Sequence, residues 1–196
     1  MENKSKFFDK FTTSVILISG IILLGTVIIF GCSYAYYVAK VSGEGKAISA
    51  TAGVLKITYT ESSAINLSAA KPINDSDKAT KSAKNVFTVA NTAAASTFNA
   101  NYNVQLTVTS IANELKSNLL KWELVKGGTV LNSGNFSNVS NNTVVNLNST
   151  PIALAKGATD SLELRIWLSY STTVDQKNML GKTLTGKIKV TSYQTN

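Results

Sequence analysis

Apolar residues recur at every second position in many short stretches of the sequence, and this alternation restricts the chain to a fold made of strands. Residues 162–168 show it most clearly, because leucine and isoleucine alternate there with Glu163, Arg165 and Trp167. Comparable runs, each bounded by Asn, Gly, Ser or Pro, cover residues 54–59, 64–68, 85–90, 102–109, 120–124, 129–131, 143–147 and 184–190. We therefore expect roughly eight to ten short strands.

The segments between these runs favour tight turns over long helices. Gly127-Gly128 predicts a hairpin turn that leads into residues 129–131. Gly186 predicts a bulge or kink in the last strand. Residues 111–118 and 174–180 have helical character, but neither stretch is long enough to form half of an α/β unit. The pattern predicts an all-β fold in which antiparallel sheets pack as a sandwich.

The composition excludes several classes of site. Histidine is absent and cysteine occurs once, so the chain has no Ser-His-Asp or Cys-His triad, no histidine-bound metal and no internal disulfide. The formal net charge is +8, yet Arg165 is the only arginine. Proteins that read nucleic acid favour arginine for its bidentate fork. We expect no catalytic residue, no metal site, no cofactor and no nucleic-acid partner.

The first 39 residues predict export. Residues 1–10 contain Lys4, Lys6 and Lys10, and no charged residue occurs between Phe11 and Ala39. The apolar centre, residues 15–32, would rise about 27 Å as a helix, which is close to the thickness of the hydrocarbon core of a membrane. The sequence therefore predicts one N-terminal hydrophobic helix, a cytoplasmic N-terminus and an extracellular or cell-surface location for the rest.

Three fates of this segment are consistent with the sequence. Signal peptidase could cut after the small-x-small site formed by Ser33 and Ala35, which would leave Tyr36 first, or after Ala39. The segment could instead remain as a membrane anchor through residues 12–39, or Cys32 could be lipidated. We accordingly divide the chain into a signal or anchor segment (1–39), a linker or donor strand (40–52) and an extracellular β-sandwich domain (53–196).

Few side chains outside the strands suggest chemistry. Asp75 and Asp77 could bind calcium through their oxygens, although a polar turn is the simpler interpretation. Trp122 shares a face with leucines and is expected in the core, whereas Trp167 lies opposite a leucine face and could stack on sugars. Four further acidic residues are interpreted as solvated surface groups: Glu114, Glu123, Asp160 and Glu163.

Several short motifs resemble the TasA/camelysin family of bacterial proteins, which are exported with SipW-type signal sequences. The hydrophobic segment ends in an aromatic-rich boundary, a Gly-x-Leu strand follows, and a proline-and-acid turn precedes a Phe-x-Val strand. The residues that carry the resemblance are Ser33–Tyr37, Gly53–Ile57, Lys71–Asp75, Val86–Thr92, Leu154–Thr159 and Leu162–Leu168.

The resemblance implies a jelly-roll-like β-sandwich with a structural role in the extracellular or biofilm matrix. In such fibres one subunit's N-terminal segment completes a neighbour's sheet, so the partners would be further copies or other matrix proteins. Residues 36–52 would be the donor here, although residues 43–46 interrupt it and only residues 47–52 are expected to pair continuously. A metalloprotease activity, which has been attributed to camelysin, has no histidine to support it.

Two other classes of function compete with the structural one. The first is a membrane-anchored binding module for cell-wall glycan or another surface molecule, which would present an exposed aromatic patch. The second is an extracellular hydrolase, which would need carboxylates that converge in a cleft.

Overall fold

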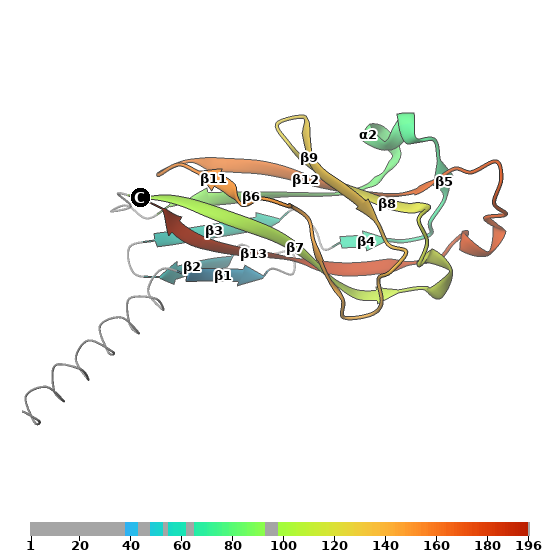
Figure 1. Cartoon of the computed structure of the whole chain (residues 1–196), viewed down its shortest axis with the longest axis horizontal. Helices are drawn as coiled ribbons and strands as arrows, with labels where there is room; N and C mark the ends of the chain where they lie inside the picture. The colour runs from blue at the N-terminus through green and yellow to red at the C-terminus, as the bar shows by residue number, and fades with distance from the viewer. Residues whose placement is uncertain (1–37, 43–47, 53–54, 62–64, 93–97, 196) are drawn as a thin grey trace, which may run out of the picture. The chain divides into compact units, whose positions relative to one another are not determined.

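The computed structural model describes residues 38–42, 48–52, 55–61, 65–92 and 98–195 of the chain. Val38–Asn196 forms one compact unit. The described residues build two sheets that pack face to face, with β12 and β6 in one layer and β7 and β13 in the other (Figure 1). This arrangement confirms the predicted all-β sandwich. The predicted N-terminal helix and most of the predicted anchor lie outside the described residues.

The first sheet, sheet A, has the strand order β1-β13-β7-β10. β11 pairs with β7 and β4 pairs with β13, and all of these pairs are antiparallel. The bounds are β1 Val38–Ser42, β4 Ile65–Leu67, β7 Asn99–Ile111, β10 Val144–Asn146, β11 Ile152–Leu154 and β13 Leu184–Thr195.

The second sheet, sheet B, has the strand order β2-β3-β6-β12-β8-β9. The two-residue strand β5 pairs with β12 in the parallel direction, and the other pairs are antiparallel. The bounds are β2 Ile48–Ala52, β3 Leu55–Glu61, β5 Pro72–Ile73, β6 Ala83–Asn91, β8 Leu120–Lys126, β9 Thr129–Asn135 and β12 Thr159–Ser169.

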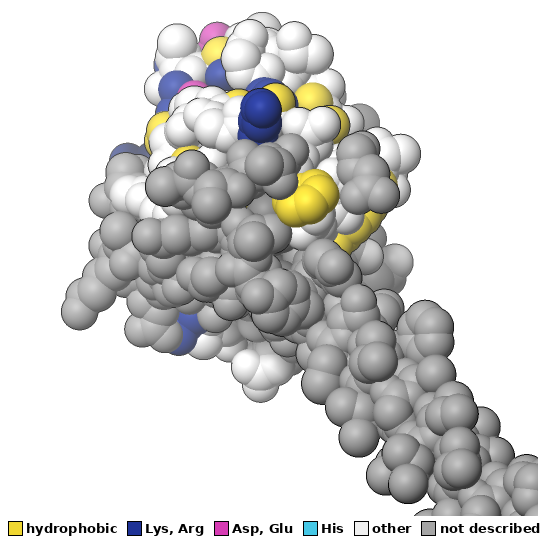
Figure 2. All heavy atoms as spheres, turned by 90° about the vertical axis from the view of Figure 1, so that its left-hand side faces the viewer, with side chains coloured by type: hydrophobic (Ala, Val, Ile, Leu, Met, Phe, Trp, Pro, Cys, Tyr) yellow, Lys and Arg dark blue, Asp and Glu magenta, His cyan; other side chains and the backbone are white. Residues whose placement is uncertain are grey.

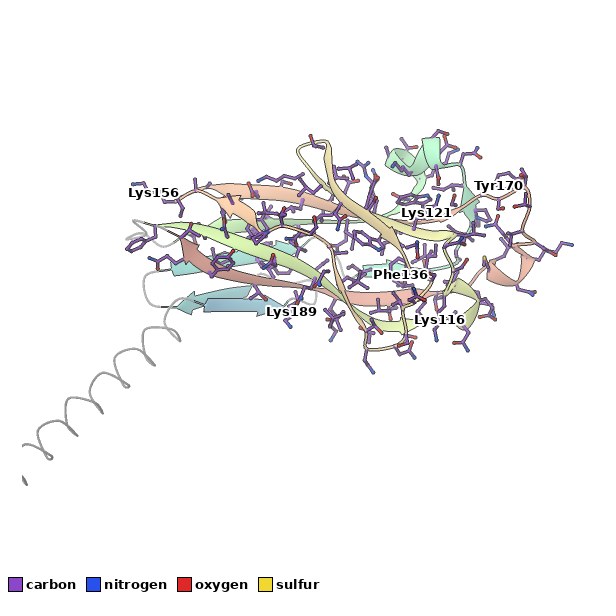
Figure 3. All side chains as sticks on the ribbon, in the orientation of Figure 1. Lys116, Lys121, Phe136, Lys156, Tyr170 and Lys189 are labelled. Atoms are coloured by element: carbon purple, nitrogen blue, oxygen red, sulfur yellow. The ribbon has the colours of Figure 1, made fainter. Side chains whose placement is uncertain are left out.

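The hydrophobic core forms where the apolar faces of the two sheets meet. Leu164 and Ile166 of β12 face Val104 and Leu106 of β7 in one cluster of buried side chains, and each of them is at most 2% exposed. Phe136, which follows β9, is fully buried and lies between the sheets (Figure 3). The period of two in the sequence thus assigned the buried face of both long strands correctly.

Two predicted irregularities are confirmed. Gly127 and Gly128 join β8 to β9, and both have positive φ angles, of 55° and 85°. Gly186 lies at a register shift in the β13–β7 pair, and a Cβ there would come within 2.7 Å of Leu106 Cδ1. Glycine at this bulge therefore lets two neighbouring strands approach closely.

Helices are scarce and short in the described part of the chain. The stretches 111–118 and 174–180 contain single 3₁₀ turns, Asn113–Leu115 and Lys177–Met179. A 3₁₀ turn at Asp75–Asp77 leads into the four-residue helix α2, Lys78–Lys81, which the alternation did not indicate. No helix among the described residues is long and apolar enough to cross a membrane.

Candidate functional site

Four residues of the predicted processing sites, Ser33, Ala35, Tyr36 and Cys32, lie outside the described residues. The segment that follows them is described in part, and it supplies the edges of both sheets. The candidate functional site is therefore built from β1 and β2 and from the strands on which they pair.

β1 pairs antiparallel with β13 over five residues, from Val38 opposite Tyr193 to Ser42 opposite Lys189. The opposite edge of β13 pairs with β7 along its whole length. β4 occupies the same edge of β13 as β1, farther along, at Leu184–Gly186. β1 therefore completes an edge of sheet A that would otherwise expose the backbone groups of residues 189–193.

β2 does the same for sheet B. It pairs antiparallel with β3, from Ile48 opposite Tyr59 to Ala52 opposite Leu55. The other edge of β3 pairs with β6. One segment, residues 38–52, thus adds an edge strand to each of the two sheets.

The prediction that only residues 47–52 pair continuously is wrong, because Val38–Ser42 pairs as well. The prediction treated the glycine-containing residues 43–46 as a break in one donor strand. They instead separate two strands that belong to different sheets. A break in one strand and a connection between two sheets have the same composition, so the sequence could not distinguish them.

The β13 segment opposite β1 presents alternate residues to the core. Ile188, Val190 and Ser192 are at most 1% exposed, whereas Lys189 and Thr191 are partly exposed. Figure 3 shows Lys189 close to the β1 edge. The acceptor edge therefore lies directly over the hydrophobic core.

A second cluster of polar side chains lies on the outer face of sheet B. The Arg165 guanidinium donates to Glu163 Oε1 at 2.6 Å and to Glu123 Oε1 at 2.9 Å. Lys78 Nζ lies 2.6 Å from Glu123 Oε2, and Lys84 Nζ lies 3.5 Å from Glu163 Oε1. The result is a chain of alternating charges that links α2, β6, β12 and β8.

The prediction that Glu123 is a solvated surface group is wrong. Its side chain is only 1% exposed, since the segment 75–81 covers that part of the sheet. A carboxylate buried in this way needs cationic partners, and it has Arg165 and Lys78. Burial raises the pKa of Glu163, but its contacts with Arg165 and Lys84 outweigh this and hold the pKa below its usual value. Both glutamates therefore act as ion-pair partners of Arg165.

Trp167 is also placed differently from the prediction. It lies opposite the leucine face, as expected, yet it is only 4% exposed. Its Nε1 donates to Asp75 Oδ1 at 2.8 Å, and Lys78 Nζ lies 5.4 Å from its ring centre. The ring is therefore covered by the segment that contains Asp75 and Lys78, and it is not available for stacking on a sugar. Trp122 is buried as predicted.

The two aspartates of the proposed calcium site are partnered by cations. Asp75 accepts a hydrogen bond from Lys121 Nζ at 2.7 Å, and Asp77 pairs with Lys81 at 2.9 Å. Burial opposes ionisation of Asp75, but hydrogen bonds from Lys121 and Trp167 outweigh it and lower its pKa to about 2. Among the described residues, no three His, Cys, Asp or Glu side chains gather in a way that could hold a metal ion.

A third polar contact joins the two sheets. Tyr102 of β7 is fully buried, and its hydroxyl donates to Asp160 Oδ2 of β12 at 2.7 Å. Lys126 Nζ lies 2.6 Å from the same oxygen. Burial and the nearby carboxylate raise the pKa of Tyr102 far above its ordinary value, so it stays a hydrogen-bond donor.

Three shallow grooves occur on the described surface. One of about 310 Å³ lies beside Trp167 and Lys121, and one of about 420 Å³ lies beside Arg165 and the Gly127-Gly128 turn. A third, of about 240 Å³, lies beside Tyr170 at one end of the domain (Figure 3). On the end of the domain near the C-terminus, Figure 2 shows single lysines and no continuous basic patch among the described residues.

The fold and these contacts define a class: an all-β sandwich with two mainly antiparallel sheets, whose N-terminal strands close both of them. No protein-family model matches the chain, and no curated protein matches it. Among solved structures, the chain is similar to Xylanase10C from Cellvibrio japonicus in complex with xylopentaose, with 12% identity and a TM-score of 0.33. The match covers 83% of this chain but 28% of the xylanase chain, and a likeness this weak carries no argument about function.

The sequence identifies the charged residues of this ion network one by one, but it does not indicate that they form a network. The signal was present in part, because the only arginine lies on the polar face of a strand beside Glu163. The sequence does not show that the network is covered, because the covering segment begins at Asp75, 92 residues before Trp167.

Proposed function

We propose that this protein is an exported structural component of the bacterial cell surface or extracellular matrix, and that copies assemble by exchanging their N-terminal strands. The observation that carries the proposal is that one short N-terminal segment provides the edge strand of both sheets. The apolar, uncharged residues 11–39 that precede this segment support export, and the resemblance to exported matrix proteins supports the structural role.

Strand exchange needs a donor that binds through backbone groups and an edge that accepts it. β1 and β2 are five residues each, and both pair with their sheets in a regular antiparallel register. A second copy can supply the same strands in the same register, so each backbone hydrogen bond within one chain is replaced by an equivalent bond between two chains.

Exchange in one direction is a head-to-tail contact, and such contacts propagate into open filaments unless the rotation between subunits closes a ring. Each copy donates β1 and β2 to one neighbour and accepts those of another. We therefore propose fibres in which every subunit is completed by the preceding one.

The experiment compares three forms of the protein. Protein that begins at Tyr36 should form concentration-dependent polymers, as measured by light scattering and electron microscopy. The Val41→Pro variant of the same protein should stay monomeric, because proline removes a backbone donor and disfavours pairing within β1. A peptide of residues 36–52, added in excess, should stop polymer growth by occupying the acceptor edges.

Monomeric behaviour of the unsubstituted protein across concentration and salt would contradict the proposal. So would polymers that form equally well from the Val41→Pro variant. Circular dichroism of each form provides the control for folding.

A second candidate is a surface-binding module, and the exposure of Tyr170 favours it. This side chain is 56% exposed beside the groove that Pro72 and Lys81 help to form. An exposed aromatic next to polar side chains is suited to binding a sugar ring. In this case Tyr170→Ala should reduce retention on insoluble cell-wall glycan, whereas Val174→Ala, at a residue that is 47% exposed, should not. Equal retention of both variants would remove this candidate.

A further inference from the structure

We propose that β9, the strand at the other edge of sheet B, pairs with β9 of a second copy about a two-fold axis. The contact would join two B sheets into one continuous sheet. It concerns the edge opposite β2 and does not depend on strand exchange. It also differs in symmetry, since a two-fold contact closes a dimer and does not propagate.

β9 is an open edge. It pairs with β8 on one side, and within the described residues no strand pairs with its other side. Figure 1 shows the β8–β9 hairpin standing out from the body of the domain at its Gly127-Gly128 turn. The backbone N–H and C=O groups along this edge are available to another strand.

β9 carries little of the usual protection of such an edge. Natural edge strands are commonly guarded by lysine, by proline, by inward charges or by a bulge. Thr129–Asn135 contains no charged residue and no proline, although the chain as a whole carries 19 basic residues, and its one protective feature is the bulge at Leu131. At the edge of sheet A, by contrast, β1 contains Lys40.

Two apolar side chains on β9 remain unburied. Val130 is 45% exposed and Leu131 is 38% exposed, and Leu131 is the extra residue of a bulge in the β8–β9 pair. A strand added at this edge would cover part of each of them. Edge pairing therefore satisfies backbone groups and removes apolar surface together.

We choose a second copy as the partner at this edge because β9 carries no charge. Two copies of a chain with net charge +8 repel each other, and this repulsion is smallest where the strands in contact are uncharged. An antiparallel overlap centred on Asn132 places residues 133–135 of one copy alongside residues 129–131 of the other, with the bulge at Leu131 inside the overlap. No like charges face each other in this register.

The first experiment measures self-association of the full chain in detergent by analytical ultracentrifugation, with Cys32→Ser in all variants. Val130→Lys and Leu131→Lys place like charges across the contact, and each should weaken the dimer by about tenfold or more. The matched control is Val144→Lys, at a residue that is 47% exposed on β10 of sheet A, and it should leave association unchanged. All variants share the apolar N-terminal residues, so differences between them report on β9.

The second measurement does not depend on the folding of the lysine variants. Asn132→Cys places one cysteine on the proposed axis, opposite its own copy, and mild oxidation should yield a disulfide-linked dimer. Val144→Cys should yield far less. If the three lysine variants associate equally, or if the Asn132→Cys dimer is no more abundant than the Val144→Cys dimer, the proposal is wrong. If strand exchange is not observed but this dimer still forms, the proposed function is wrong and the β9 contact stands.

Discussion

At the scale of single residues, the outer face of sheet B is held together by charges that lie close to one another and are shielded from water to different degrees. Glu123 is almost completely buried, Arg165 is 16% exposed and Lys78 is 36% exposed. Removing Glu123, the most buried member, takes an acceptor away from both Arg165 and Lys78. The free-energy cost of leaving these donors unpaired exceeds the net stability that the ion pair contributes. The cluster therefore fixes the segment 75–81 against the sheet.

Glu123→Ala should lower the free energy of unfolding by about 1–3 kcal/mol, because Arg165 loses one of its two acceptors and Lys78 loses its carboxylate. The control is Glu114→Ala, which removes a surface pair with Lys182 and should lower the free energy of unfolding much less than Glu123→Ala does. Urea unfolding of both variants measures the difference. Equal losses would mean that Glu123 is solvated.

The lowered pKa of Asp75 predicts that the stability of the domain decreases in acid. Its folded pKa of about 2 lies below the ordinary value of 3.8, so its contribution is fully present above about pH 4 and is lost as the pH falls through 2. The difference in unfolding free energy between the wild type and Asp75→Asn should therefore be constant from pH 7 to 5 and shrink between pH 4 and 2. A difference that does not change over that acid range would contradict the assigned contacts with Lys121 and Trp167.

The same residues show where sequence reasoning stops. The alternation of Trp167 with leucines correctly places the ring on the face opposite the core, where it could have been exposed and stacked on sugars. The ring is only 4% exposed, because Asp75 and Lys78 come from a distant segment that covers it. Periodicity reports which side of a sheet a residue occupies, but it cannot report what packs on that side.

At the scale of elements, the long strands, the hairpin and the short strands β4 and β10 were predictable, whereas the short strands β5 and β11 were not. β7 and β12 each bury a regular row of apolar residues, and two adjacent glycines mark the β8–β9 turn. β5 and β11 have only two and three residues, which is too few for a period to appear. β1 was not predicted as a strand of its own, because residues 43–46 suggested an interruption of one donor strand.

Gly186→Ala should lower the free energy of unfolding by about 1–3 kcal/mol. The new methyl group would lie 2.7 Å from Leu106 Cδ1 and 2.9 Å from the Thr107 carbonyl oxygen, and the backbone oxygen cannot move aside cheaply. Thr183→Ala, three positions earlier and exposed, should change the stability by less than about 0.5 kcal/mol. Thermal unfolding of the two variants provides the test, and a neutral Gly186→Ala would mean that the bulge relaxes.

At the scale of the whole molecule, the central feature is that the edges of both sheets depend on one N-terminal segment. β1 and β2 contact the rest of the domain as edge strands, so their removal opens sheet A at β13 and sheet B at β3. Whether these edges are closed by the same chain or by a neighbour decides between a self-contained domain and a fibre subunit. We propose that the neighbour closes them once copies are concentrated at the cell surface.

The most direct test of this proposal mixes two single-cysteine variants, both carrying Cys32→Ser. Lys40 and Thr191 are opposite each other in the β1–β13 register, so Lys40→Cys in one chain and Thr191→Cys in the other can form a disulfide only if β1 of the first lies on β13 of the second. A third variant, Lys156→Cys, replaces Thr191→Cys as the control for random collision. Strand exchange predicts a heterodimer from the Lys40 and Thr191 pair and almost none from the control. If the two mixtures cross-link equally, while a chain that carries both Lys40→Cys and Thr191→Cys closes an internal disulfide, then each chain completes its own sheets and the fibre account is wrong.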